Sequence, residues 1–139
     1  ERQILLTTAG NLATSQAVVS ILTEQTKERE KRSPSILEAP TMFQVARIVS
    51  ETLAEVIKIS ARGQQKAEST FTSTFILGGQ IKGGIPRLYL IYPEGNFIEV
   101  TNDNPFFQIG EIIIMHYYTI FQRIGCLVFL QRELGPLGC

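Results

Sequence analysis

The spacing of the apolar residues changes once along the chain, and this change constrains the fold more than any other feature. In residues 41–63 apolar side chains recur every three or four positions, as on one face of a helix: Met42, Val45, Val49, Leu53 and Val56. From residue 71 onward, "STFTSTFIL" and "RLYLIY" alternate every second position, as half-buried strands do. The sequence therefore predicts a long amphipathic helix followed by antiparallel strands.

The ends of these predicted elements carry their own signals. Thr41 and Gln44 have capping-box spacing just after Pro40, which indicates the start of the helix. Gly63 is predicted to end it, because glycine adopts the left-handed conformation that follows many helices. We predict an antiparallel meander over residues 71–100, with "GQIKGGIP" and "PEGN" as its turns.

The first forty residues predict a strand, a helix and a linker. Residues 3–9 form the strand, Gly10 turns the chain, and a helix begins near Leu12 with Asn11 as its N-cap. One predicted inner face of this helix holds Leu12, Ser15, Val19 and Leu22, with Val18 and Ile21 beside it. The linker is "TKEREKRSPSILEAP". Strand, helix, helix and meander together are an α+β layout with helices layered on a sheet, and the start on a strand indicates the later part of a larger protein.

Composition limits the classes of function. The 139 residues carry zero formal charge, so the sequence predicts no nucleic-acid partner, which would need a basic face. Cys126 and Cys139 are too few for a disulfide framework or a zinc site. We therefore predict no metal and no cofactor. The first residues lack the pattern of a signal peptide, which favours a cytoplasmic location.

The segment 112–133, "IIIMHYYTIFQRIGCLVFLQRE", is strongly apolar. It has the roughly 20 residues that a membrane span needs, but Arg123 sits in its middle with His116 and Gln122 nearby. We predict a buried helix or strand pair and no membrane partner; a non-native tail from a reading-frame change stays open. His116 and Cys126 could form a nucleophile pair only in a cleft, so a packed histidine is the favoured interpretation.

One stretch has catalytic geometry, "LLTTAGNLATSQAVVSIL" at residues 5–22. A strand that breaks on a glycine into a helix can aim backbone N–H groups at a ligand or a reacting carbonyl. The same arrangement also serves as a plain packing turn, and the residues alone leave both interpretations open. The glycines of "GGQIKGG" lack the Gly-Lys-Ser/Thr ending of a phosphate loop and indicate a turn.

Several motifs agree in order and spacing with one family. "TTAGNLATSQAVVSIL" and "FILGGQIKGGIPRLYLIYPEGNFIEVTNDNPFFQIGE", with the amphipathic helix between them, resemble the proteasome β-subunit superfamily of N-terminal-nucleophile hydrolases, in particular its bacterial ancestral type, Anbu. The resemblance implies an αββα sandwich, incomplete in this chain. It implies a partial proteasome-like domain at residues 1–111, and residues 112–139 form an apolar segment that does not match the family.

The resemblance also implies a chemistry and a site. Active members of the family are threonine peptidases in which the α-amino group of an N-terminal threonine acts as base, tuned by a lysine and an aspartate; an α-amine titrates near pH ~8. These three residues have no counterpart in this sequence, which starts at Glu1, and Thr7 carries no free α-amine. What carries over is Gly10 as the oxyanion donor through its backbone N–H, with Thr8 and Leu12 lining a substrate pocket.

Two functions follow as hypotheses. The first is a threonine peptidase or amide hydrolase subunit acting on peptide or amide substrates, of which this chain alone is inactive. The alternative is a non-catalytic assembly subunit or interaction module. Both imply self-association into a ring or spiral homo-oligomer, and the polypeptide upstream of Glu1 discriminates them. Because the first strand is expected to have an unpaired edge, we also predict that the isolated chain self-associates or aggregates.

Overall fold

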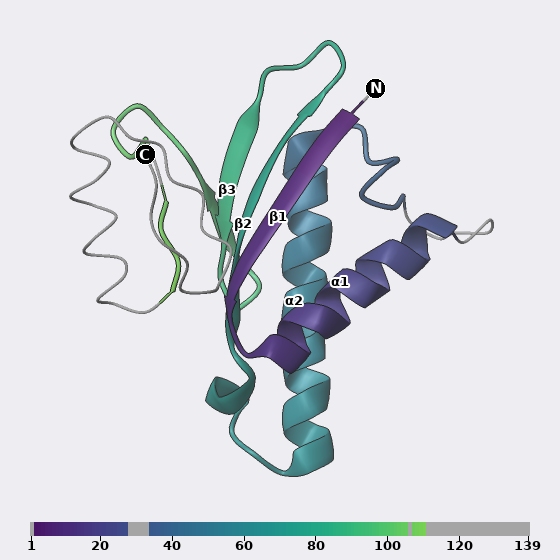
Figure 1. The fold of residues 1–139 in the computed structure, drawn as a ribbon, viewed down its shortest axis with the longest axis vertical. Coiled ribbons are helices and arrows are strands. Elements are labelled where there is room, and N and C mark those ends of the chain that lie inside the picture. The colour runs from purple at the N-terminus through teal and green to yellow at the C-terminus, as the bar shows by residue number, and fades with distance from the viewer. Residues whose placement is uncertain (1, 28–33, 106, 111–139) are drawn as a thin grey trace, which may run out of the picture.

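The computed structural model describes residues 2–27, 34–105 and 107–110. The elements follow the order β1 (Arg2–Gly10), α1 (Leu12–Lys27), α2 (Met42–Gln64), the 3-10 helix η1 (Glu68–Phe71), β2 (Ser73–Ile81), β3 (Arg87–Ile91) and β4 (Phe97–Glu99). Figure 1 shows α1 and α2 on the same side of the sheet, with α1 crossing α2. The predicted α+β class is confirmed.

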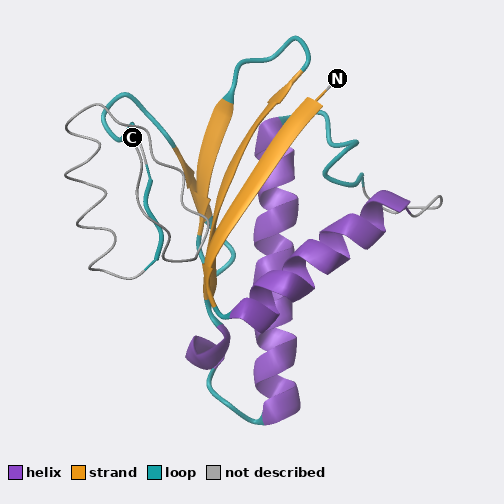
Figure 2. Ribbon diagram, in the orientation of Figure 1, coloured by secondary structure: helices purple, strands orange, loops and turns teal. Residues whose placement is uncertain are grey.

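The described strands form one antiparallel sheet in the order β1-β2-β3-β4. The predicted meander supplies β2, β3 and β4, and β1 joins it through a register that places Leu6 opposite Leu77 and Thr8 opposite Phe75. In Figure 2 the strands form one layer and the helices a second layer against one face of it. The described residues thus contain one sheet and one helical layer of the expected sandwich.

The core lies between α2 and the sheet. The predicted inner face of α2 is confirmed, because each of its five apolar residues is buried. They face buried side chains at alternate positions of β2 and β3: Phe75, Leu77, Tyr89 and Ile91. Leu90, between the last two, is buried as well. Burial of this apolar area, at about 25 cal/mol per Å², is what holds the helix layer on the sheet.

The start of α2 matches the prediction and its end does not. The Thr41 hydroxyl accepts a hydrogen bond from the Gln44 N–H at 3.2 Å, as an N-cap does. The helix then runs past Gly63, and Gln65 takes the left-handed conformation with φ 52°. The Gln65 N–H donates to the Arg62 carbonyl at 3.3 Å. This backbone bond accompanies the helix cap at Gln65. A Cβ atom at position 63 would meet nothing within 4 Å, so packing does not require glycine there.

Strand β2 extends three residues, 79–81, into the stretch "GQIKGGIP" that was predicted as a turn. It begins at Ser73, after η1, and continues through Gly78 and Gly79 to Ile81. A Cβ atom at Gly79 would lie 2.7 Å from Cε of Met42 and 2.6 Å from the Gln3 carbonyl oxygen. This glycine therefore serves close packing of α2 on the sheet, and the chain reverses only after the strand ends.

Helix α1 is rotated relative to its prediction. Asn11 is the N-cap, as predicted, since its Oδ1 accepts from the Thr14 N–H at 3.0 Å. However, Leu12 and Val19 are 57% and 46% exposed, and Thr14 is buried. Ser15, Leu22 and the adjacent Val18 are buried as predicted, and Thr14 takes the place that was expected for Leu12 or Val19.

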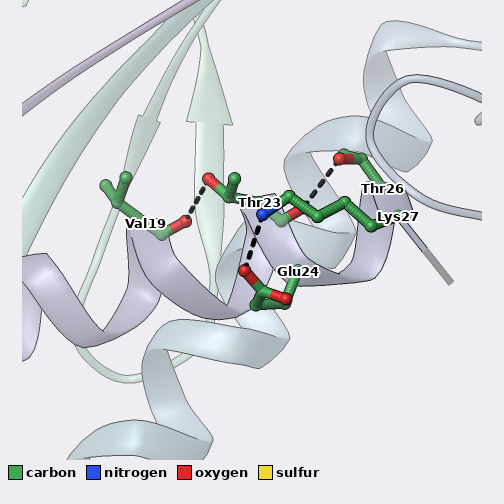
Figure 3. A network of polar contacts seen from close by, with 5 residues as sticks. All are labelled: Val19, Thr23, Glu24, Thr26 and Lys27. Carbon is green, nitrogen blue, oxygen red and sulfur yellow. Dashed lines mark hydrogen bonds and ion pairs between the residues drawn. The ribbon is translucent and has the colours of Figure 1, made fainter.

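The C-terminal half of α1 is an exposed helix end. Figure 3 shows its polar contacts, all within the helix: the Thr23 hydroxyl donates to the Val19 carbonyl at 2.8 Å, and the Thr26 hydroxyl donates to the Thr23 carbonyl at 2.7 Å. Lys27 pairs with Glu24 at 2.9 Å, and both side chains are more than half exposed. This end faces solvent, as the charged residues after it predict.

The predictions for residues 112–139, including the His116–Cys126 pair, lie outside the described residues. Among the residues that are described, no helix is long and apolar enough to cross a membrane. The same part of the chain contains no group of His, Cys, Asp and Glu side chains that could hold a metal ion.

Candidate functional site

Gly10 sits where β1 ends and the chain turns into α1. Its φ is +119°, a conformation that L side chains rarely adopt. A Cβ atom on Gly10 would lie 2.6 Å from the Thr72 carbonyl oxygen and 2.9 Å from Cα of Ser73. Both the backbone conformation and the packing therefore require glycine at this position.

The hydrogen-bond ladder fixes where the Gly10 N–H points. The Asn11 N–H donates to the Thr72 carbonyl at 2.9 Å, and Gly10 lies opposite Ser73 in the register. In an antiparallel ladder, residues that bond to the neighbouring strand alternate with residues that do not. Ala9 and Asn11 bond to the β2 side, so the Gly10 N–H points away from it. Since β1 is an edge strand of the described sheet, this N–H points to the open edge.

Three hydroxyl groups, those of Thr8, Ser15 and Ser73, form a cluster beside the turn. The Thr8 and Ser15 hydroxyls lie 2.8 Å apart, and the Ser15 and Ser73 hydroxyls lie 3.0 Å apart. Ser15 and Ser73 both donate to the Asn11 carbonyl, at 3.0 and 2.9 Å. Because Ser15 and Ser73 are 4% and 2% exposed, these bonds are shielded from water and fix the turn firmly.

Asn11 and Thr14 fasten the turn to the chain that enters β2. The Asn11 amide donates to the Thr70 carbonyl at 3.2 Å, and the Thr14 hydroxyl donates to the Phe71 carbonyl at 2.8 Å. Asn11 was predicted as the N-cap, whereas the contacts that it and Thr14 make with residues 70 and 71 were not predicted. Hydroxyl residues at the inward positions of α1 and β2 were the available signal.

The other two predicted site residues flank Gly10. The Thr8 hydroxyl is turned to the helix side, where it is bonded to Ser15, and the Thr8 N–H points to the open edge like that of Gly10. Leu12 is the exposed first residue of α1. The hydrogen bonds described around this turn involve only hydroxyl, amide and backbone groups. The arrangement can therefore donate hydrogen bonds to an extended peptide, while the described residues of the turn supply no acid or base.

The comparison with solved structures shows one relationship. No protein-family model matches the sequence, and no curated protein matches it. Among solved structures, Anbu from Hyphomicrobium sp. strain MC1 is 48% identical over 80% of this chain and 44% of its own, with a TM-score of 0.67. Anbu, the ancestral β-subunit, from Yersinia bercovieri is 38% identical over 89% of this chain and 48% of its own, with a TM-score of 0.76.

A third match describes an assembly. The helical assembly of the Anbu complex from Pseudomonas aeruginosa is 39% identical over 88% of this chain and 48% of its own, with a TM-score of 0.75. The fold and these matches make the chain proteasome-like. Within that class it is of the Anbu type. The chain spans about half the length of the Anbu structures that it matches: 44% and 48%.

Proposed function

We propose that this chain forms the oxyanion-donor part of the active site of an Anbu-type amide hydrolase, a threonine peptidase subunit. The observation that carries the proposal is the Gly10 N–H, which points to the open edge from a turn that buried hydroxyls hold in place. A preorganised donor aimed at a developing oxyanion contributes roughly 3 kcal/mol of transition-state stabilisation.

In this proposal the substrate is an extended peptide lying along β1. The Thr8 and Gly10 N–H groups would bond its backbone, since both point to the open edge. Leu12 offers an exposed apolar side chain for a substrate residue. Thr8 would act as a positioning residue as well, because its hydroxyl belongs to the cluster under the turn.

Amide NMR can test the donor directly. A short peptide phosphonate, which carries the tetrahedral anion, is titrated into ¹⁵N-labelled protein and compared with the matched neutral peptide amide. We expect the largest downfield proton shift at Gly10, a smaller one at Thr8, and little change at Ala9, which bonds to β2. A response centred elsewhere, or an equal response to both ligands, would contradict the proposal.

The nucleophile is a separate question. We expect a preparation of these 139 residues to show no turnover of fluorogenic peptides, because its N-terminal residue is Glu1 and not a threonine with a free α-amine. The comparison is a longer protein that carries an N-terminal threonine before this segment. Turnover by the 139-residue chain would disprove the assignment of the nucleophile to another segment.

A second candidate function is a non-catalytic assembly subunit in a cytoplasmic ring or spiral homo-oligomer. The Pseudomonas helical assembly supports self-association of relatives. The polypeptide that precedes Glu1 discriminates the two candidates: a threonine nucleophile with its lysine and aspartate favours the peptidase. A longer protein that lacks them, yet assembles, favours the assembly subunit.

A further inference from the structure

The hydroxyl cluster beside the Gly10 turn has more contacts than protons. Its contacts are Thr8–Ser15 at 2.8 Å, Ser15–Ser73 at 3.0 Å, and one from each serine to the Asn11 carbonyl, at 3.0 and 2.9 Å. Each contact needs one proton; every hydroxyl supplies one and the carbonyl supplies none. Three contacts can therefore be filled only if the Thr8 proton fills one of them. Among the described residues the Thr8 hydroxyl contacts only that of Ser15, so Thr8 donates to Ser15.

This direction of donation leaves the Thr8 oxygen with only lone pairs on its outer side, where Thr8 is exposed among the described residues. We propose that Thr8 selects substrates whose neighbouring side chain carries a hydrogen-bond donor, such as a carboxamide or an ammonium group. The inference rests on the proposed function, which lays the substrate along β1. A substrate residue that bonds the Gly10 N–H lies opposite Gly10, so its side chain projects on the same face as Thr8 and diagonal to it.

A substrate side chain that can only accept a hydrogen bond is disfavoured at this position. To donate outward, the Thr8 hydroxyl must withdraw its proton from Ser15, and the cluster then fills one contact fewer. Ser15 and Ser73 are 4% and 2% exposed, so water does not replace the lost bond. A donor on the substrate leaves every bond of the cluster in place. We expect this difference to favour the donor about fivefold in Kd.

Two peptide phosphonates test the proposal on the full 139-residue chain. They differ only in the side chain of the residue that bears the phosphonate, which is a carboxamide in one and a methyl ketone of the same shape in the other. The carboxamide donates hydrogen bonds, whereas the ketone only accepts them. Kd is measured for each from the shift of the Gly10 amide in ¹⁵N-labelled protein. We expect the carboxamide to bind about fivefold more tightly.

Two serine variants separate this role from a structural one. Ser15→Ala removes the acceptor of the Thr8 proton, so Thr8 can donate outward and the ratio of the two Kd values should fall to near one. The matched control is Ser73→Ala, which removes a buried hydroxyl of the same cluster. It leaves two protons for two contacts, Thr8 still donates to Ser15, and the ratio should persist. A structural role would change the ratio alike in both variants.

Thr8→Val keeps the shape of the side chain and removes its hydroxyl, so it should abolish the ratio by weakening the carboxamide. This variant carries the test if Ser15→Ala loses its helical circular-dichroism signal. Equal Kd values in the wild type, a ratio that survives Thr8→Val, or a ratio that Ser73→Ala abolishes would each overturn the selection by Thr8. The proposed function stands in these cases as long as Gly10 responds to both phosphonates. No response at Gly10 to either one overturns the proposed function and this inference with it.

Discussion

Two turns in this chain each place a glycine at positive φ and differ in how that glycine is packed. Gly10 has φ +119° and is enclosed by the chain that enters β2, with no room for a Cβ atom. Gly83, in the turn between β2 and β3, has φ +84° but nothing within 4 Å of the position of a Cβ atom. The hairpin turn therefore needs glycine only for its backbone conformation. The site turn needs it also for packing, which is why its N–H is held in one direction.

The largest expected effect is that of Gly10→Ala. The left-handed conformation costs an L residue about 1–2 kcal/mol, and displacing the neighbouring backbone costs about 1–3 kcal/mol more. We expect urea denaturation to show a loss of roughly 3 kcal/mol or more in the free energy of unfolding. A loss equal to that of Gly83→Ala would erase the difference between the two turns.

The next effect sharpens the role of the hydroxyl cluster. Ser15→Ala removes the hydroxyl that links Thr8 to Ser73 and leaves buried partners with fewer hydrogen bonds. We expect a loss of about 1–3 kcal/mol in the free energy of unfolding. Ser20→Ala, on the exposed side of α1, is the matched control and should change stability little. Equal losses in the two variants would contradict the importance of the cluster.

Gly83→Ala should cost less than Gly10→Ala, about 1 kcal/mol, because only the backbone conformation opposes it. Asparagine tolerates the left-handed region better than other residues, so Gly83→Asn should recover most of this loss. Thermal unfolding of the two variants measures both. If asparagine is as harmful as alanine, the hairpin turn is constrained by contacts as well.

The smallest effect is expected at the ion pair near the same hairpin. Arg87 bonds Glu99 at 2.6 Å, but the side chains are 43% and 35% exposed. Exposed pairs are screened by salt and contribute little. We expect Arg87→Met to leave the denaturation midpoint of the fold within measurement error at 0.5 M salt, where the Debye length falls to roughly 4 Å from about 10 Å at 0.1 M. A clear destabilisation at that salt concentration would show that the Arg87–Glu99 pair contributes to the stability of the sheet.

What the sequence could predict depended on how local the signal was. The buried face of α2 and the Thr41 cap were predictable, since helical spacing and capping residues act within a few positions. The end of α2 was not predictable, because Gly63 and Gln65 lie within one helical turn and the sequence does not show which of them leaves the helix. In the structure Gln65 does so, and its N–H donates to the Arg62 carbonyl. The inner face of α1 was predicted in part: Ser15, Val18 and Leu22 are buried as expected. The burial of Thr14 was missed because its contact with the Phe71 carbonyl is polar.

The site shows the same limit more strongly. The residues alone singled out the turn at Gly10, and the resemblance to a family implied the role of its N–H. Nothing in the neighbouring sequence shows that the Thr72 carbonyl oxygen lies against this glycine. The bond that joins Ser73 to the Asn11 carbonyl links residues 62 positions apart. Such contacts follow from the pairing of β1 with β2, which local patterns do not encode.

That pairing also has a consequence for the order of folding. β1 meets β2 only after residues 11–72, which connect the two strands, have closed into a loop, and loop closure over such a distance slows folding. The hairpin of β2 and β3 needs only a short loop and packs directly under α2. We therefore expect this hairpin and α2 to form first and β1 to dock last, so that the turn at Gly10 is completed at the final step of folding.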